Sequence, residues 1–284
     1  MENSGGFHYE GEKAWCAGCG DFGILAALEK ALLKSGKRPD EVLVVSGIGQ
    51  AAKMPHYIKT NGFNGLHGRA LPPAFGAKAA NHKLTVIVAS GDGDMYGEGG
   101  NHFIHNIRRN IEITAIAHNN QIYGLTKGQA SPTSERGMKT KLQPEGVILT
   151  PFNPIAVAIA LDAPFVARSF SQEVELTAEL ILEAMSVPGF AFIDVLQPCV
   201  SFNKLNTYEW YQKRSYKLGP DHDPADKAKA LEKAFEWGER IPLGVIYKNP
   251  RPGYVANTIG LDSEPLINKT TALEDVKRLT EKFY

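Results

Sequence analysis

The stretch Gly91–Gln129, GDGDMYGEGGNHFIHNIRRNIEITAIAHNNQIYGLTKGQ, decides how the fold of the whole chain is interpreted. Asp92 stands in a glycine-rich turn after one apolar run, and an Asn-Asn pair follows a second run, with Asn120 28 residues beyond Asp92. A carboxylate, an amide oxygen and the carbonyl of Ile122 are the hard oxygen ligands that Mg²⁺ takes, with phosphates completing its shell. The glycines beside Asp92 let the backbone approach those phosphates. The spacing predicts a divalent cation held against a diphosphate; two polar turns of an ordinary α/β domain are the alternative.

The composition is that of a globular protein, with 43% apolar and 22% charged residues among 284. Lys plus Arg and Asp plus Glu balance at 31 each, so the overall charge does not favour a nucleic-acid partner. No apolar run reaches the ~18 residues of a membrane span, and the N-terminus has no apolar signal core. We therefore expect a cytoplasmic protein without a membrane partner, in which three cysteines do not form a disulfide framework.

Strand and helix patterns alternate through the first 200 residues, which predicts an α/β fold with a doubly wound, mostly parallel sheet and helices on both faces. The predicted strands are Val42–Val45, Leu84–Ala89, Ile111–Ala117, Phe165–Ala167 and Phe190–Leu196. The predicted helices are Asp21–Ser35, Pro72–Asn81, Asn101–Arg109, Pro154–Leu161 and Val174–Met185. We expect residues 1–202 to form this domain.

Residues 203–284 differ in character and are expected to form a C-terminal extension. Helices are predicted near Lys227–Trp237 and Leu273–Phe283, separated by loop-rich sequence. The extension either packs on a neighbouring subunit, closes over the site, or covers its own domain.

The unusual residues directly follow the predicted strands. SGIGQ, GDGD, NNQIYG and QPC each stand at the end of an apolar run. In open α/β sheets, ligands bind outside the carboxyl ends of the strands. These segments therefore predict one shared site at one edge of the sheet.

The three cysteines have two predicted functions and an inert alternative. Cys16 and Cys19 form a CxxC pair, and Cys199 ends the last predicted strand. Spaced thiolates hold iron–sulfur clusters, zinc with a histidine as fourth ligand is the competing assignment, and inert cysteines remain the third interpretation.

Six segments together resemble the β subunit of 2-oxoacid:ferredoxin oxidoreductases. They are WCAGCGDFGIL, SGIGQAAKMP, LHGRALPPAFGAKAAN, GDGDMYGEGGNHF, HNNQIYGLTKGQASPTS and IDVLQPC, and they span residues 15–199 in the order of that family. The GDG and NN elements by themselves are similar to the signature of thiamine-diphosphate enzymes. The resemblance implies the thiamine-diphosphate-binding fold, and a redox centre beside that cofactor would serve as its electron acceptor, which favours the cluster.

The resemblance also implies a role for each matching position. Mg²⁺ would be held by Asp92, Asn120 and the carbonyl of Ile122. Positions at thiamine diphosphate would be Gly20, Asp21, Ile48, Gly49, His67, Gly68, Arg69, Gly91, Gly93, Asp94, Tyr123, Gly124, Leu125 and Thr126. Of these, Leu125 and Thr126 lie on the substrate side, and with Lys53, near the substrate carboxylate, they are the catalytic candidates.

Cys16, Cys19 and Cys199 match three ligands of a 4Fe–4S cluster in that family. Many members have a fourth cysteine where this chain has Gln50, and the chain contains no other cysteine. The fourth ligand is therefore not identified: the cluster could use a non-cysteine ligand, lose one iron readily, or be absent.

The activity implied is coenzyme A-dependent oxidative decarboxylation of a 2-oxoacid, pyruvate or 2-oxoglutarate, to acyl-CoA and CO₂. Electrons would pass through the cluster to ferredoxin. The glutamate that activates the cofactor would come from a partner α subunit, in an (αβ)₂ or larger complex. The alternatives are half of a non-redox thiamine-diphosphate decarboxylase and a non-catalytic zinc or iron–sulfur subunit.

Isolated residues keep simpler interpretations beside these. Lys53 could be a surface lysine and His67 a structural histidine. His102 and His105 are more readily explained as helix-face residues than as metal ligands. The basic residues of the extension form either a docking patch for coenzyme A or ferredoxin or a solvated face; they are Lys204, Lys213, Arg214 and Lys217.

Overall fold

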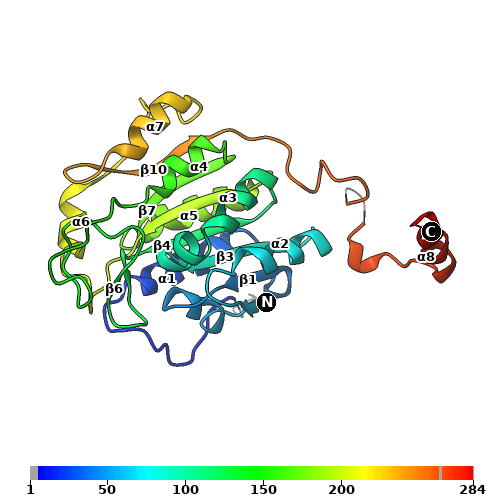
Figure 1. Ribbon diagram of the computed structural model, residues 1–284, viewed down its shortest axis with the longest axis horizontal. Helices are drawn as coiled ribbons and strands as arrows, with labels where there is room; N and C mark the ends of the chain where they lie inside the picture. The colour runs from blue at the N-terminus through cyan, green and yellow to red at the C-terminus, as the bar shows by residue number, and fades with distance from the viewer. Residues whose placement is uncertain (1–5, 262–263, 284) are drawn as a thin grey trace.

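The computed structural model describes residues 6–261 and 264–283 and is built on one eight-stranded sheet (Figure 1). The strand order across the sheet is β2-β1-β3-β4-β8-β7-β10-β9. The strands are β1 Val42–Ser46, β2 Asn61–Asn64, β3 Thr85–Gly91, β4 Thr114–Asn119, β7 Phe165–Phe170, β8 Ala191–Leu196, β9 Ser215–Lys217 and β10 Ile241–Lys248. A short hairpin, β5 Ile122–Tyr123 with β6 Gln129–Ala130, follows β4.

The sheet is mostly parallel, as predicted. Every pairing from β2 across to β7 is parallel, and β10 then runs antiparallel to β7. Gly91 at the end of β3 is paired with His118 on β4, and Asn119 on β4 is paired with Leu196 on β8. The polar segments that follow these strands therefore emerge at one edge of the sheet.

Helices cover both faces of the sheet, which confirms the predicted doubly wound architecture (Figure 1). Helices α1 Asp21–Lys34 and α5 Val174–Ser186 pack on one face. The other face carries α2 Leu71–Ala80, α3 Gly100–Arg109, α4 Pro154–Ala160 and α7 Lys227–Phe235. Successive strand residues alternate between the two cores, because side chains on a strand point to opposite faces.

The C-terminal extension contributes two strands to the same sheet. After α6 Tyr208–Arg214, strands β9 and β10 lie beyond β7 at the sheet edge. The sequence pattern did not indicate β10, where Gly244 has φ +126° and the register shifts between Val245 and Tyr247. Part of the extension thus belongs structurally to the sheet, and the boundary at residue 202 remains a prediction.

The last helix, α8 Leu273–Thr280, lies apart from the sheet at the end of a long segment (Figure 1). It forms where a helix was predicted, and all of its residues are exposed. Over the described ranges, no helix combines the length and apolarity needed to span a bilayer.

Phe103 on α3 is the centre of an aromatic cluster that fastens this helix to the sheet. It is fully buried and its ring lies 4.9 Å from Phe192 and 5.5 Å from Tyr96, centroid to centroid. We expect Phe103→Ala to lower the free energy of unfolding by about 3–5 kcal/mol, through lost burial and the cavity left behind. Ile104→Ala, at the neighbouring half-exposed position, should cost less than about 1 kcal/mol. Urea unfolding measures both; equal losses would contradict this packing.

Candidate functional site

A groove lies at the carboxyl ends of β1, β3 and β4, where the polar segments meet. Gln50 and Ala51 line it beside most of the predicted cofactor-binding residues. Those residues are Ile48, Gly49, His67, Gly91, Asp92, Gly93, Asp94, Asn120, Ile122, Tyr123, Gly124, Leu125 and Thr126. The structure therefore brings together segments that are up to about eighty residues apart in the sequence, while the role of each residue stays a prediction.

The carboxylate of Asp92 lies buried at the floor of this groove, at the start of η3 Gly93–Glu98. The hydroxyls of Ser131 and Thr133 each lie 2.5 Å from its Oδ2. Burial raises the pKa of Asp92 to about 6, and the two hydroxyls act in the opposite direction. No lysine, arginine or histidine of the described residues forms an ion pair with this carboxylate, so a bound cation would find its charge uncompensated.

The turn after β4 presents the other two predicted metal ligands. Asn120 Oδ1 accepts a hydrogen bond from the backbone N–H of Ile122 (3.0 Å), which closes the turn. Between them Gln121 has φ +58°, an uncommon conformation for a side chain other than glycine. Asn203 supports the turn from outside by donating to the Asn120 carbonyl (3.0 Å). The Asn120 side-chain oxygen has two lone pairs, so the hydrogen bond from the Ile122 N–H leaves one of them able to bind a metal.

Tyr123 packs directly on the glycine-rich turn. Its hydroxyl lies 3.2 Å from the carbonyl oxygen of Gly93 and 3.0 Å from Glu98 Oε2. A Cβ atom on Gly93 would lie 2.2 Å from the Tyr123 ring, so only glycine fits there. Burial, followed by Glu98, raises the pKa of the Tyr123 phenol well above its usual range, which keeps it a hydrogen-bond donor.

Asp94 joins three segments that surround the groove. Its Oδ1 accepts hydrogen bonds from the backbone N–H groups of Ile48 (3.1 Å) and Gly68 (2.7 Å), and its Oδ2 accepts from Ser90 Oγ (2.5 Å). His67 Nδ1 also lies 2.6 Å from Oδ1. The position was predicted to lie at the diphosphate; here its oxygens are used to hold the SGIG and LHGR loops in place.

Several other predicted residues do not line the groove. Gly68 and Arg69 stand behind it, and Arg69 contacts His102, which accounts for this histidine as a helix-face residue. Lys53, in η2 Ala51–His56, donates to the carbonyl of Ala14 (2.8 Å). Gly20 lies at the start of α1 against Gln197, away from the groove.

Cys16, Cys19 and Cys199 line a second, adjoining pocket together with Gln50. The two hollows share Gln50, Asn120 and Gly124 in their walls. Each of two sulfurs also has a polar neighbour, since Ser201 donates to Cys16 Sγ (3.1 Å) and Gln197 to Cys19 Sγ (3.3 Å). The cysteines therefore meet beside the groove, as the strand-end argument predicted.

The environment of Cys19 is unfavourable for a bare thiolate. Burial, followed by the charge of Asp21, raises the pKa of the Cys19 thiol well above its ordinary range. Asp21, predicted at the cofactor, lies instead in this pocket and holds His118 through a 2.7 Å contact. Within residues 6–261 and 264–283, no three His, Cys, Asp or Glu side chains converge as ligands of one metal ion.

Three functional residues had no predicted role. The hydroxyls of Ser131 and Thr133 lie within hydrogen-bonding distance of Asp92, and Glu98 holds Tyr123 and lies 3.3 Å from His67 Nε2. All three stand inside segments that carry the resemblance, but their residue types gave no reason to assign them a role. The fold identifies them, because it returns the loop after β6 to the end of β3 and holds Glu98 in η3 beside Tyr123.

Two family models match this chain. One, described as thiamine pyrophosphate enzyme, C-terminal TPP binding domain, matches residues 44–195. The other describes the C terminal part of the pyruvate ferredoxin oxidoreductase beta subunit and matches residues 199–262. The first includes the whole groove from the SGIG loop to the Thr133 segment, and the second begins at Cys199 and covers most of the extension.

Curated relatives and a solved structure are similar over nearly the whole chain. The 2-oxoacid:ferredoxin oxidoreductase 1, subunit beta, of Aeropyrum pernix is 49% identical over 247 residues, 83% of this chain and 78% of that protein. A β subunit of the same description from a Sulfolobus species is 45% identical over 281 residues, 94% and 91% of the two chains. The 2-oxoglutarate:ferredoxin oxidoreductase from Magnetococcus marinus superposes with a TM-score of 0.90 at 35% identity, covering 96% of this chain and 94% of that one.

The contact between Gly93 and Tyr123 makes a direct prediction. Gly93→Ala should lower the free energy of unfolding by about 1–3 kcal/mol, because its methyl group overlaps the aromatic ring. Gly91→Ala is the matched control, since its Cβ would approach nothing closer than 4.0 Å. Chemical denaturation compares the two variants, and a Gly93→Ala protein as stable as Gly91→Ala would show that the ring does not pack as described.

Proposed function

This chain belongs to the family of 2-oxoacid:ferredoxin oxidoreductase β subunits, and from that membership we propose that its groove binds thiamine diphosphate with Mg²⁺. The observation that carries the proposal is the convergence of Asp92 and Asn120 at the ends of the adjacent strands β3 and β4. The relatives confirm the predicted resemblance, and the chain is a subunit of an oxidoreductase of this kind.

The groove offers the ligand set that Mg²⁺ and a diphosphate require. We assign the Asp92 carboxylate, the Asn120 amide oxygen and the Ile122 carbonyl to the metal, as hard oxygen donors. Gly93, beneath the Tyr123 ring, brings backbone N–H groups close to the phosphates. When bound, thiamine diphosphate supplies the nucleophilic carbon that attacks the ketone carbon of a 2-oxoacid. Leu125 and Thr126, at the groove, are assigned to the substrate side.

The cysteine pocket supports a redox reaction next to the groove. We propose that Cys16, Cys19 and Cys199 hold a 4Fe–4S cluster that accepts electrons one at a time and passes them to ferredoxin. This proposal is supported by the shared wall, because the proposed metal ligand Asn120 lines both the cysteine pocket and the groove. A zinc site is disfavoured, because no three ligands in the described ranges converge on one ion, whereas a cluster binds each thiolate to a different iron. A non-redox thiamine-diphosphate decarboxylase needs no electron acceptor, so that alternative leaves the cysteine pocket without a function.

The proposed substrate is a 2-oxoacid, pyruvate or 2-oxoglutarate, converted with coenzyme A to acyl-CoA and CO₂. The structure from Magnetococcus marinus has 2-oxoglutarate, coenzyme A and succinyl-CoA bound, which supports this substrate class for a related chain. Lys53 donates a hydrogen bond to the carbonyl of Ala14. In this proposal, Lys53 must break that hydrogen bond to reach a substrate carboxylate.

An α subunit is the proposed partner, and it would complete the site with the activating glutamate. Helix α8 has an exposed apolar stripe at helical spacing, formed by Leu273, Val276 and Leu279. This stripe supports a contact between α8 and another subunit. We assign this stripe to the contact with the α subunit in an (αβ)₂ or larger complex.

Asp92→Asn separates metal binding from stability. Burial raises the pKa of Asp92 from 3.8 to about 6. Between these two pH values the native state therefore holds a proton that the unfolded chain has released. That stabilising contribution is complete below about pH 3.8 and is lost as the pH rises through about 6. The neutral variant avoids the loss. We therefore expect it, free of metal, to be more stable than wild type at pH 7 by on the order of 1–3 kcal/mol.

The same variant should bind Mg²⁺-thiamine diphosphate on the order of 100-fold more weakly, because it lacks the charged ligand. Asp40→Asn, at an exposed carboxylate outside the groove, is the control and should change neither property. Calorimetric titration and unfolding at pH 5 and pH 7 measure both effects. Wild-type cofactor affinity in a folded Asp92→Asn protein would refute the metal assignment.

Gln50→Cys tests the cluster. Gln50 lines the cysteine pocket, so a thiol there should supply a fourth ligand and slow the loss of iron in air several-fold. Iron and sulfide are measured over time in anaerobically prepared enzyme exposed to oxygen. Ala51→Cys, next in the chain and outside that pocket, should leave the rate unchanged. Zinc in place of iron, or equal rates in all three proteins, would count against the proposed cluster.

A further inference from the structure

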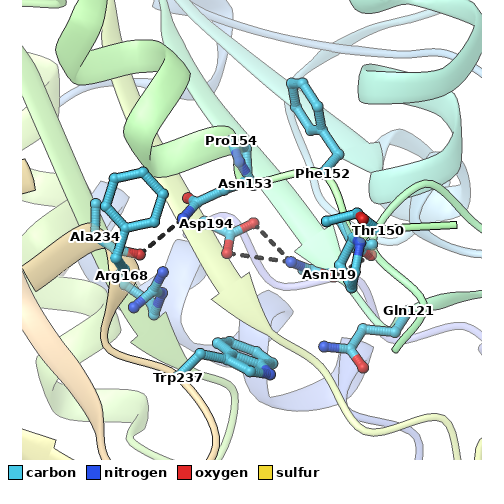
Figure 2. A pocket seen from close by; sticks show the side chains of 13 residues that line it. Asn119, Gln121, Thr150, Phe152, Asn153, Pro154, Arg168, Asp194, Ala234 and Trp237 are labelled. Atoms are coloured by element: carbon cyan, nitrogen blue, oxygen red, sulfur yellow. Dashed lines mark hydrogen bonds between the residues drawn. The ribbon is translucent and has the colours of Figure 1, made fainter. Parts of the chain in front are cut away.

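A cavity of about 260 Å³ lies behind the turn that follows β4 and shares no lining residue with the groove (Figure 2). It is enclosed by the ends of β4, β7 and β8, the segment 150–154 and the end of α7. Its polar wall includes Asn119, Gln121 and Arg168, and its apolar wall includes Phe152, Phe235 and Trp237. Its volume approaches the lower end of the ~300–1,000 Å³ of small-molecule sites.

Arg168 is the unusual residue of this cavity. Its side chain projects from β7, and the residue is only 3% exposed. Nε and Nη1 of its guanidinium have no hydrogen-bond partner in the described part of the chain. A buried arginine remains charged and presents donors only, and the described residues offer no acceptor to these two N–H positions.

Asp194 balances the charge of Arg168 without supplying those acceptors. The two residues are paired across β7 and β8. The hydrogen bonds of Asp194 come instead from Tyr96 Oη (2.8 Å) and from Asn119 Nδ2 (3.1 and 3.2 Å). Asp194 thus has hydrogen-bond donors of its own, and Figure 2 shows the two hydrogen bonds from Asn119. Arg168 therefore remains available to an incoming group.

The other walls describe what that group carries. The Trp237 ring lies over the Arg168 guanidinium, with its centroid 5.6 Å from Cζ (Figure 2). Phe152 and Phe235 continue this apolar lining. One charged anchor within apolar and aromatic walls is the usual design of a site for a small organic acid.

We propose that this cavity binds a small organic carboxylate, with its carboxylate on Arg168 and its apolar part against Trp237 and Phe235. The site is distinct from the proposed cofactor groove but close to it. Thr133 lines the cavity, and its hydroxyl lies 2.5 Å from Asp92 Oδ2. Thr133 is therefore shared between the wall of the cavity and the surroundings of the proposed metal ligand.

The test uses the assembled enzyme with saturating Mg²⁺-thiamine diphosphate, so that the groove is filled. Benzoate and its neutral isostere benzamide are titrated by calorimetry. Benzoate should bind at least about ten times more tightly, because only its charge is complementary to Arg168. Arg168→Met should remove this preference. Arg214→Met is the matched control, since Arg214 also lies over a tryptophan, Trp210, but outside the cavity.

A second measurement decides the matter if Arg168→Met does not fold. In crystals of the wild-type enzyme soaked in 4-bromobenzoate, the anomalous bromine signal should lie between Trp237 and Phe235. Three results would overturn the proposal: equal affinity for benzoate and benzamide, no saturable binding of benzoate, or bromine at other positions only.

Discussion

The buried carboxylate of Asp92 is the constraint on which the surrounding structure depends. A carboxylate at the end of a sheet strand, without a cationic partner, requires hydrogen-bond donors or a metal. The loop after β6 supplies donors by returning Ser131 and Thr133 to the end of β3. Burial still raises its pKa, so the buried charge is unfavourable, and a divalent cation bound as proposed would relieve it. Part of the binding free energy of that cation would then come from the cost of burying the carboxylate on folding.

The rest of the groove depends on two glycines whose backbone lies in contact with a neighbouring side chain. Gly93 must lack a side chain because Tyr123 lies on it, and Gly47 must lack one because Asp94 Oδ2 would lie 2.0 Å from its Cβ. Asp94 in turn fixes the two loops that form the far wall. The cysteine pocket begins where this wall ends, at Gln50. The proposed metal site and the proposed redox centre are thus parts of one rigid edge of the sheet.

The sequence predicted the central sheet and the site because both have local signals. Continuous apolar runs identify buried parallel strands, and the polar residues after each run identify the edge where ligands bind. Strand β2, NGFN, was missed because all of its residues are exposed and carry no apolar pattern. Strand β10 was missed because Gly244, with φ +126°, and a register shift between Val245 and Tyr247 interrupt its pattern. Ser131, Thr133 and Arg168 acquire their roles only from tertiary packing, which no local pattern records.

Iron-edge anomalous diffraction from anaerobic crystals of the assembled enzyme, grown with Mg²⁺-thiamine diphosphate, tests the central claim most directly. We expect iron between Cys16, Cys19 and Cys199. In the electron density of the same crystals we expect Mg²⁺ at about 2.0–2.1 Å from oxygen atoms of Asp92, Asn120 and Ile122. Iron absent from the cysteine pocket, or a diphosphate whose metal does not contact Asp92, would contradict this assignment.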